Sequence, residues 1–127
     1  MHIADRIRSW VAETPKASFH VDNECARYGG ISLDATIGSI WLLRPDGSFW
    51  DVDDDSGKPL QPLAEQWQLT ALVAGAERHH WLRELVPQRP PGAGDCPGCG
   101  GAGKLRTGSD AEHFVYCPAC QALGWIT

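Results

Sequence analysis

The sequence predicts an α+β fold in which a small antiparallel sheet packs with helices and a compact four-cysteine module follows at the C-terminal end. Three patterns predict this fold. A β-hairpin pattern spans residues 37–52, helical patterns lie on either side of it, and two Cys-x-x-Cys pairs lie close to the C-terminus. We therefore expect an α+β domain over residues 1–86, a linker rich in proline and glycine over 87–94, and the cysteine module over 95–127.

The first helix is predicted from an apolar stripe. Ile3, Ile7 and Trp10 recur at helical spacing within residues 2–13, and the polar and charged residues of the other side are Asp5, Arg6, Arg8, Ser9 and Glu13. Pro15 restricts the residue before it to extended conformations. We therefore expect the helix to end just before this proline.

The hairpin over residues 37–52 is expected next, after a segment that shows no clear pattern. Its strands are rich in β-branched and aromatic residues, and they flank an Arg-Pro-Asp-Gly turn at residues 44–47. Alternation places Trp41, Leu43 and Phe49 on one face. We expect this face to lie at the centre of the larger domain's core.

Four aspartates lie at the end of the hairpin: Asp51, Asp53, Asp54 and Asp55. A calcium loop would need a glycine at its sixth position and a glutamate at its twelfth, but counting from Asp51 finds Ser56 and Pro62 there. A solvated acidic turn is the simpler interpretation. The alternative is that these aspartates form a partner-binding patch that attracts a basic protein.

A short strand and then a helix are expected between the hairpin and the linker. Residues 66–69 alternate polar and apolar, which favours a third strand, and Thr70 is placed to cap a helix that begins at Ala71. The apolar face of this helix shifts near Gly75. We therefore expect a kink, or two short helices, before Pro87.

Three other candidates for chemistry stand apart from the paired cysteines. His79 and His80 are adjacent, so a helix would point them about 100° apart and prevent them from sharing a metal ion. Cys25 has no basic neighbour in a recognisable activating pattern and is expected to be a buried or indifferent thiol. We assign no catalytic or metal-binding role to these three residues.

The paired cysteines predict a metal site. In the sequence, 17 residues separate the first pair from the second, and this spacing is typical of a structural zinc site. Two residues between cysteines allow a tight turn that aims both sulfurs at one point, and two such turns complete a tetrahedron. We expect one zinc ion per chain, and its ligands are Cys96, Cys99, Cys117 and Cys120.

Short strands are expected within the module. One candidate strand, Lys104–Arg106, follows the first cysteine pair, and another, Phe114–Tyr116, precedes the second pair. The two segments can pair as a small hairpin that resembles a zinc ribbon or knuckle. Trp125 and Ile126 are expected to fold back as an apolar cover. Because so small a unit has little core of its own, it should unfold when the metal is removed.

The first cysteine pair also carries a second pattern. Residues 96–103 read Cys-Pro-Gly-Cys-Gly-Gly-Ala-Gly, and this CxxCxGxG repeat resembles the cysteine-rich zinc domain of DnaJ-type co-chaperones. The second copy, residues 117–124, has Ala122 in place of a glycine, so this turn is expected to be looser or to pack differently. The family has four repeats and two zinc ions, so two repeats imply one ion. The sequence has no His-Pro-Asp tripeptide, and the resemblance therefore excludes a J-domain.

The resemblance covers only residues 96–125, and it implies a metal-stabilised module with a chaperone-like role. The hairpin stretch from Trp41 to Trp50 is similar to that of uncharacterised bacterial proteins in which it precedes a paired-cysteine tail. This second likeness implies no activity.

Composition limits the classes of function. The net charge is −5, with 9 basic and 13 acidic residues before Asp95 and 2 basic and 3 acidic from there on. Neither part is basic, which disfavours a nucleic-acid partner. The sequence has no apolar run of membrane-spanning length and no secretory signal, so we expect no membrane partner and a cytoplasmic location. In that compartment paired cysteines are metal ligands more often than disulfides.

These observations favour a non-enzymatic zinc protein that binds another protein, either as an immunity or inhibitor protein against a basic toxin or as a chaperone-like accessory protein. One alternative is a thiol-disulfide oxidoreductase that uses the Cys-x-x-Cys pairs, although the glycines after Cys99 disfavour the helix that such a site usually opens. Another is a nucleic-acid-binding zinc protein, for which the module offers only Lys104 and Arg106. The sequence does not determine the oligomeric state.

Overall fold

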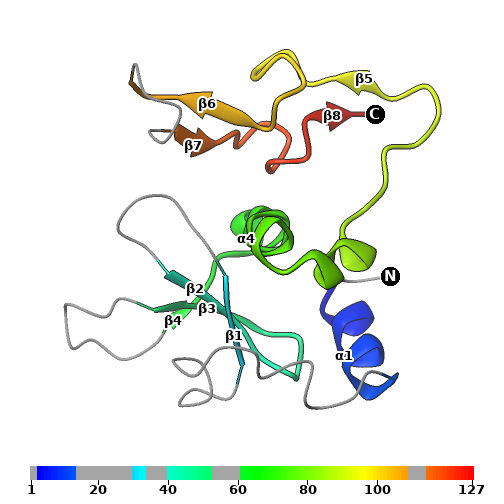
Figure 1. Ribbon diagram of the computed structural model, residues 1–127, viewed down its shortest axis with the longest axis vertical. Helices are drawn as coiled ribbons and strands as arrows, with labels where there is room; N and C mark the ends of the chain where they lie inside the picture. The colour runs from blue at the N-terminus through cyan, green and yellow to red at the C-terminus, as the bar shows by residue number, and fades with distance from the viewer. Residues whose placement is uncertain (1–2, 14–29, 34–39, 53–60, 109–113) are drawn as a thin grey trace.

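The computed structural model describes residues 3–13, 30–33, 40–52, 61–108 and 114–127. Its elements are α1 (Ile3–Glu13), β1 (Ile31–Leu33), β2 (Ile40–Leu43), β3 (Phe49–Val52), β4 (Gln61–Pro62), α4 (Glu65–Arg78), the 3-10 helix η1 (His80–Leu85), β5 (Gly94–Asp95), β6 (Lys104–Arg106), β7 (Phe114–Tyr116) and β8 (Trp125–Ile126). Figure 1 shows α4 between the sheet of β1 to β4 and the module of β5 to β8. The small antiparallel sheet packed with helices confirms the predicted α+β class.

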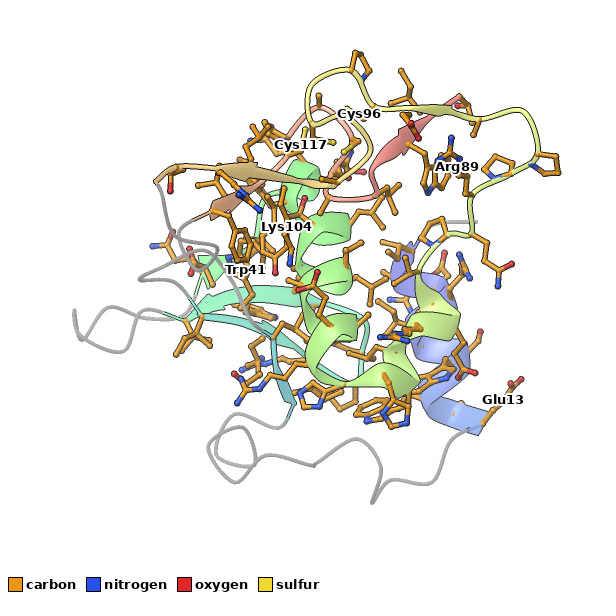
Figure 2. The ribbon with its side chains drawn as sticks, turned by 45° about the horizontal axis from the view of Figure 1, so that its top comes forward. Glu13, Trp41, Arg89, Cys96, Lys104 and Cys117 are labelled. Carbon is orange, nitrogen blue, oxygen red and sulfur yellow. The ribbon has the colours of Figure 1, made fainter. Side chains whose placement is uncertain are left out.

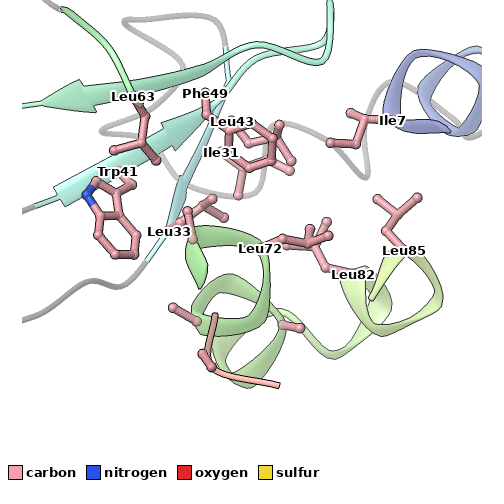
Figure 3. Close-up of a cluster of buried hydrophobic side chains, with 14 of the residues drawn as sticks. Ile7, Ile31, Leu33, Trp41, Leu43, Phe49, Leu63, Leu72, Leu82 and Leu85 are labelled. Atoms are coloured by element: carbon pink, nitrogen blue, oxygen red, sulfur yellow. The ribbon is translucent and has the colours of Figure 1, made fainter. Parts of the chain in front are cut away.

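The predicted hairpin forms from β2 and β3, which pair antiparallel with Leu43 opposite Phe49. Trp41, Leu43 and Phe49 lie together in the main buried cluster, as the alternation predicts (Figure 3). The other face of the hairpin carries a smaller buried cluster around Leu42 and Val52. The hairpin therefore carries buried side chains on both faces.

The hairpin turn has the conformation that its Arg-Pro-Asp-Gly sequence predicts. The N–H of Gly47 donates to the carbonyl oxygen of Arg44 over 2.9 Å, and Gly47 has a φ of +85°, a left-handed conformation that favours glycine. The carboxylate of Asp46 accepts a hydrogen bond of 2.9 Å from the N–H of Ser48. This side-chain bond holds the turn in shape where β3 begins.

Two short strands extend the hairpin into a four-stranded sheet. β1 pairs with β2, with Ile31 opposite Leu43, and β4 pairs with β3, with Gln61 opposite Asp51. β1 lies where the sequence shows no clear pattern, because three residues are too few to establish a period. Even so, Ile31 and Leu33 are fully buried and belong to the main cluster.

α1 confirms the first predicted helix and packs against both the hairpin turn and η1. Ile7 is fully buried, and the indole of Trp10 stacks on that of Trp81 with ring centroids 5.4 Å apart. A Cβ placed on Gly47 would lie 2.4 Å from the carbonyl oxygen of Ala4. A glycine at this turn is therefore needed both for its φ angle and for the close approach of the helix.

The predicted third strand and the predicted cap at Thr70 are wrong. α4 begins at Glu65, so residues 66–69 are helical and Thr70 lies fully buried inside the helix. The residues of α4 that are buried are Thr70, Ala71, Leu72, Ala74, Gly75 and Ala76. Because the sheet and the cysteine module cover the helix on two sides, it lacks the broad polar face that would reveal helical periodicity.

The predicted interruption of the second helical region is confirmed, and His79 lies at the break between α4 and η1. Its Nε2 is 3.3 Å from the carbonyl oxygen of Ser32 in β1, and its ring centroid is 5.5 Å from that of Trp81. His79 therefore joins the interruption between the two helices to the edge strand of the sheet. His80 is exposed at the start of η1.

The cysteine module consists of two small antiparallel ladders. β6 pairs with β7, with Leu105 opposite Val115, as predicted. β8 pairs with β5, with Trp125 opposite Asp95. The C-terminal segment therefore forms a second ladder instead of the expected apolar cover, and Ile126 remains 41% exposed. No helix among the described residues is long and apolar enough to span a membrane.

Candidate metal centre

Four cysteine sulfurs converge between the two ladders of the module. The Sγ atoms of Cys96, Cys99, Cys117 and Cys120 all lie within 4.8 Å of one another. Three of these residues are buried and Cys99 is partly exposed. Figure 2 shows Cys96 and Cys117 close together in the module beyond α4. The four predicted ligand residues are thus brought to one point and could hold a metal ion.

Two distances between the sulfurs fit the spacing around a tetrahedral ion. The Sγ atoms of Cys96 and Cys117 are 3.9 Å apart, and those of Cys99 and Cys120 are 3.7 Å apart. Metal–sulfur bonds of about 2.3 Å at tetrahedral angles place sulfurs about 3.8 Å apart. A disulfide would require a separation of about 2.05 Å. The donor set and its spacing therefore suit a thiolate-bound metal, and all four thiols are unbridged.

The two cysteine turns are related by an internal repeat, in which each residue of the first copy precedes its counterpart by 21 positions. The N–H of Cys96 donates to the carbonyl oxygen of Gly124 over 3.0 Å, and the N–H of Cys117 donates to that of Gly103 over 2.9 Å. The two ladders show the same exchange between copies. The strand before the first cysteine pair, β5, pairs with β8 of the second copy, and the strand before the second pair, β7, pairs with β6 of the first copy. Each turn is therefore completed by the glycine that ends the other copy.

The backbone conformation repeats as well, even where the residues differ. Gly100 and Gly101 have φ angles of 64° and 90°, and their counterparts Gln121 and Ala122 have φ angles of 51° and 69°. The second turn therefore keeps the backbone of the first, despite the alanine. A residue with a side chain in this left-handed region costs about 1–2 kcal/mol relative to glycine.

The location of Ala122 explains how this cost is offset. Ala122 is 8% exposed and belongs to the main buried cluster with the sheet and α4, whereas its counterpart Gly101 is exposed next to Asp95. Burial of a methyl group contributes about 0.8 kcal/mol. The second turn thus packs differently at its side chain and not in its backbone.

Backbone amides point at the sulfurs and change the pKa values of the metal-free thiols. Desolvation raises the pKa of Cys99, but amide donors from Gly103 and Gly101 outweigh it and lower this pKa to about 7. At Cys120, desolvation raises the pKa to about 12 although the amide of Gly124 opposes it. The two amide-to-sulfur distances, from Gly103 and from Gly124, are both 3.2 Å. These amides are donors that a bound thiolate would accept.

The module is joined to α4 by a polar clamp and by apolar packing. The ammonium of Lys104 lies 3.1 Å from the carboxylate of Glu77, which also accepts a hydrogen bond of 3.4 Å from the hydroxyl of Tyr116. The ring of Tyr116 is 4% exposed and lies in the main buried cluster. The residue next to ligand Cys117 is therefore part of the same core as the sheet.

The other sequence candidates do not join this centre. Asp51 is exposed on β3, opposite Trp41 in the sheet register, and Asp53, Asp54 and Asp55 lie outside the described residues. Cys25 also lies outside them. Within the described part of the chain, His79 and His80 belong to no group of potential metal ligands. Comparison of the chain with protein-family models, with curated proteins and with solved structures finds no match.

Proposed function

We propose that the four cysteines bind one zinc ion and that the ion stabilises the protein without taking part in a reaction. The observation that carries this proposal is the set of four buried or partly buried thiols whose sulfurs all lie within 4.8 Å of one another. Zinc accepts four thiolates in closed structural sites, whereas catalytic zinc keeps one position open for water or substrate. A site with four sulfur ligands has no such position.

We propose further that the protein acts as a module that binds another protein. The net charge of −5 favours a partner with a basic surface. The module presents two large apolar side chains to solvent, since Val115 is 36% exposed and Ile126 is 41% exposed. Apolar side chains in such positions support association with a protein more than with nucleic acid. In the described part of the module, Lys104 is already paired with Glu77, which leaves little charge for phosphates.

The metal is tested by elemental analysis of the purified chain together with a thiol titration before and after a chelator. We expect one zinc per chain and four thiols that react only after chelation. Iron in place of zinc would contradict the identity of the metal. Absence of any metal, with thiols that oxidise in pairs, would contradict the structural site and favour the thiol-disulfide oxidoreductase. An insulin-reduction assay tests that alternative directly, with the double variant Cys99→Ser/Cys120→Ser as control.

The class of partner is tested by affinity capture on the zinc-loaded chain, with Cys117→Ser/Cys120→Ser as the metal-free control. A captured protein counts only if it binds again in purified form. One basic protein bound at a 1:1 ratio would favour an immunity or inhibitor role. Binding of many unfolded proteins, and suppression of their aggregation, would favour a chaperone-like role. Recovery of nucleic acid in place of protein would overturn the proposal.

A further inference from the structure

A pocket of about 370 Å³ lies where the sheet, α4 and the cysteine module meet. We call it the seam pocket, and its lining residues are Trp41, Asp51, Leu63, Trp67, Thr70, Val115, Tyr116 and Pro118. Ligand pockets start at about 300 Å³, so this volume suits one or two side chains and not a large cofactor. Figure 2 shows Trp41 on the side of the sheet that faces the module.

The wall of the seam pocket is mainly aromatic and apolar, with one buried polar residue. Thr70 is fully buried, and its Oγ1 has no hydrogen-bond partner among the described residues. An unpaired buried hydroxyl costs about 1–3 kcal/mol. The protein therefore keeps, at this wall, a polar atom that its own fold does not use.

The charge around the seam pocket is negative. Asp51 is exposed and lines the pocket, and the described lining residues include no lysine, arginine or histidine. Asp51 lies directly opposite Trp41 in the sheet register. A carboxylate beside indole rings attracts a cation, because the faces of the rings carry negative charge as well.

The same chemistry already occurs in the neighbouring module. The ammonium of Lys104 lies 4.5 Å from the ring centroid of Phe114 and 5.9 Å from that of Tyr116. Its charge is balanced by the carboxylate of Glu77 at 3.1 Å. Aromatic rings with one carboxylate thus hold a lysine within this protein, and the seam pocket offers an equivalent combination with no cation of its own among the described lining residues.

We propose that the seam pocket is the docking site of the partner protein, and that it binds a large apolar side chain flanked by a lysine or arginine. The apolar side chain lies against Trp41 and Trp67, the cation approaches Asp51, and the hydroxyl of Thr70 bonds a polar atom of the bound segment. This inference rests on the proposed function, because it identifies the surface and the chemistry by which the partner is recognised. Aromatic pockets of this kind carry most of the energy of many protein interfaces.

The seam pocket is also linked to the metal site. Val115, Tyr116 and Pro118 form its module side, and the last two flank ligand Cys117 in the sequence. Without the metal, Cys117 would no longer be held by coordination, so Tyr116 and Pro118 would no longer be fixed in position at this wall. The partner is therefore bound only by the metal-loaded protein.

The test uses the full, zinc-loaded chain labelled with ¹⁵N and titrated with two capped tripeptides. Acetyl-Lys-Phe-Lys-amide and acetyl-Glu-Phe-Glu-amide share the apolar residue and differ in the sign of their charge. We expect the lysine peptide to shift the indole N–H signals of Trp41 and Trp67 and the amide signal of Thr70, and to bind about tenfold more tightly than the glutamate peptide. A chelator should abolish these shifts. Equal binding of the two peptides, or shifts confined to other residues, would overturn the proposal.

Two variants assign the roles of individual residues. Asp51→Asn should reduce the preference for the lysine peptide severalfold, whereas Glu84→Gln, which removes the same charge from η1 outside the pocket, should not. Thr70→Val should raise the thermal stability of the free protein, since it removes an unpaired buried hydroxyl, and should weaken peptide binding by about fivefold. A Thr70→Val chain that binds the peptide as tightly as before would overturn the role of this hydroxyl.

The two proposals fail in distinguishable ways. A chain that contains zinc and binds a partner protein, but shows no peptide shifts at the seam pocket, would contradict the docking site and leave the proposed function intact. A chain without metal would contradict the proposed function whatever the peptides do.

Discussion

Gly103 and Gly124 are the residues at which the cysteine module leaves the least room for a side chain. A Cβ on Gly103 would lie 2.4 Å from the carbonyl oxygen of Ala122, and a Cβ on Gly124 would lie 2.5 Å from that of Gly101. Both contacts are with backbone atoms, which cannot move aside without opening the turn. These two positions therefore require glycine for space as well as for their positive φ angles.

Gly103→Ala is expected to destabilise the metal-loaded protein by about 3 kcal/mol or more, because the cost of the left-handed conformation and the cost of the clash with Ala122 are added together. Gly100→Ala is the matched control, since Gly100 has a φ of 64° but no atom within 4 Å of a built Cβ. It should cost about 1–2 kcal/mol. Thermal unfolding of both variants measures the difference. Equal losses would show that the module widens to accept a methyl group at Gly103.

At the scale of elements, the hairpin turn contains a carboxylate whose charge contributes to folding. The hydroxyl of Ser48 donates to Asp46 and is the main cause of a lowered pKa at this carboxyl, with burial acting in the opposite direction. A carboxyl whose pKa is lower in the folded than in the unfolded state stabilises the fold above the unfolded pKa of about 3.9, and this contribution is lost as pH falls through the folded pKa.

Asp46→Asn should therefore lower the free energy of unfolding at neutral pH by about 0.5–1 kcal/mol, a range that allows for the exposure of the turn. The deficit should shrink as the pH falls from about 4 through the lowered pKa of the folded carboxyl, below which the wild-type carboxyl is also neutral. Urea unfolding at several pH values measures it. A deficit that stays constant with pH would mean that the charge of Asp46 contributes nothing.

The elements that the sequence predicts well are those defined by local signals. The Pro-Asp-Gly turn predicts the hairpin, and the two extended segments beside the cysteine pairs predict the ladder of β6 and β7, because each signal lies within a short stretch of sequence. The start of α4 could not be predicted, since Trp67 and Leu69 alternate with polar residues as a strand would and the helix is buried on two sides. β5 and β8 were missed because strands of two residues are defined only by the repeat that pairs them.

One part of the candidate site could be predicted from local sequence and another part could not. Its four ligands follow from the spacing of the cysteines, and the structure brings them together. The seam pocket does not follow from any local pattern, because Trp41, Thr70 and Tyr116 come from three separate segments. Asp51 was singled out for its charge alone, and its position opposite Trp41 depends on the register of the sheet.

At the scale of the whole molecule, the module and the sheet share one core. Tyr116 and Ala122 are buried in the same cluster as Leu72 and Phe49. Removal of the metal is therefore expected to destabilise the entire protein and not the module alone, since a structural zinc contributes an apparent binding free energy of about 10–16 kcal/mol. That range is comparable to the total stability of a typical domain.

We expect a chelator to lower the thermal midpoint in a single transition that is seen alike by tryptophan fluorescence and by far-ultraviolet circular dichroism. Cys25→Ser, which removes a thiol but keeps the four candidate ligands, is the control and should show the same fall of the midpoint on chelation. A chelated protein that keeps its tryptophan signal while residues 95–127 unfold would show that the sheet and α4 are stable without the module.

Zinc affinity should also fall steeply with pH, because bound thiolates carry no protons. In the metal-free protein Cys120, with a pKa of about 12, is protonated at neutral pH, and Cys99, with a pKa of about 7, gains its proton below it. Zinc must displace these protons, so its affinity should fall at least about tenfold per unit as pH decreases. Competition with a chromophoric chelator at several pH values measures the slope. An affinity independent of pH would contradict thiolate ligation.

The exchange of hydrogen bonds between the two cysteine turns has a consequence for biosynthesis. The N–H of Cys96 is satisfied by Gly124, and that of Cys117 by Gly103, so the first turn stays incomplete until Gly124 has left the ribosome. Domains generally form in the order in which they are translated. We therefore expect the side of α4 that faces the module to stay exposed during synthesis until β8 emerges, and we expect any metal ion to be bound only after that point.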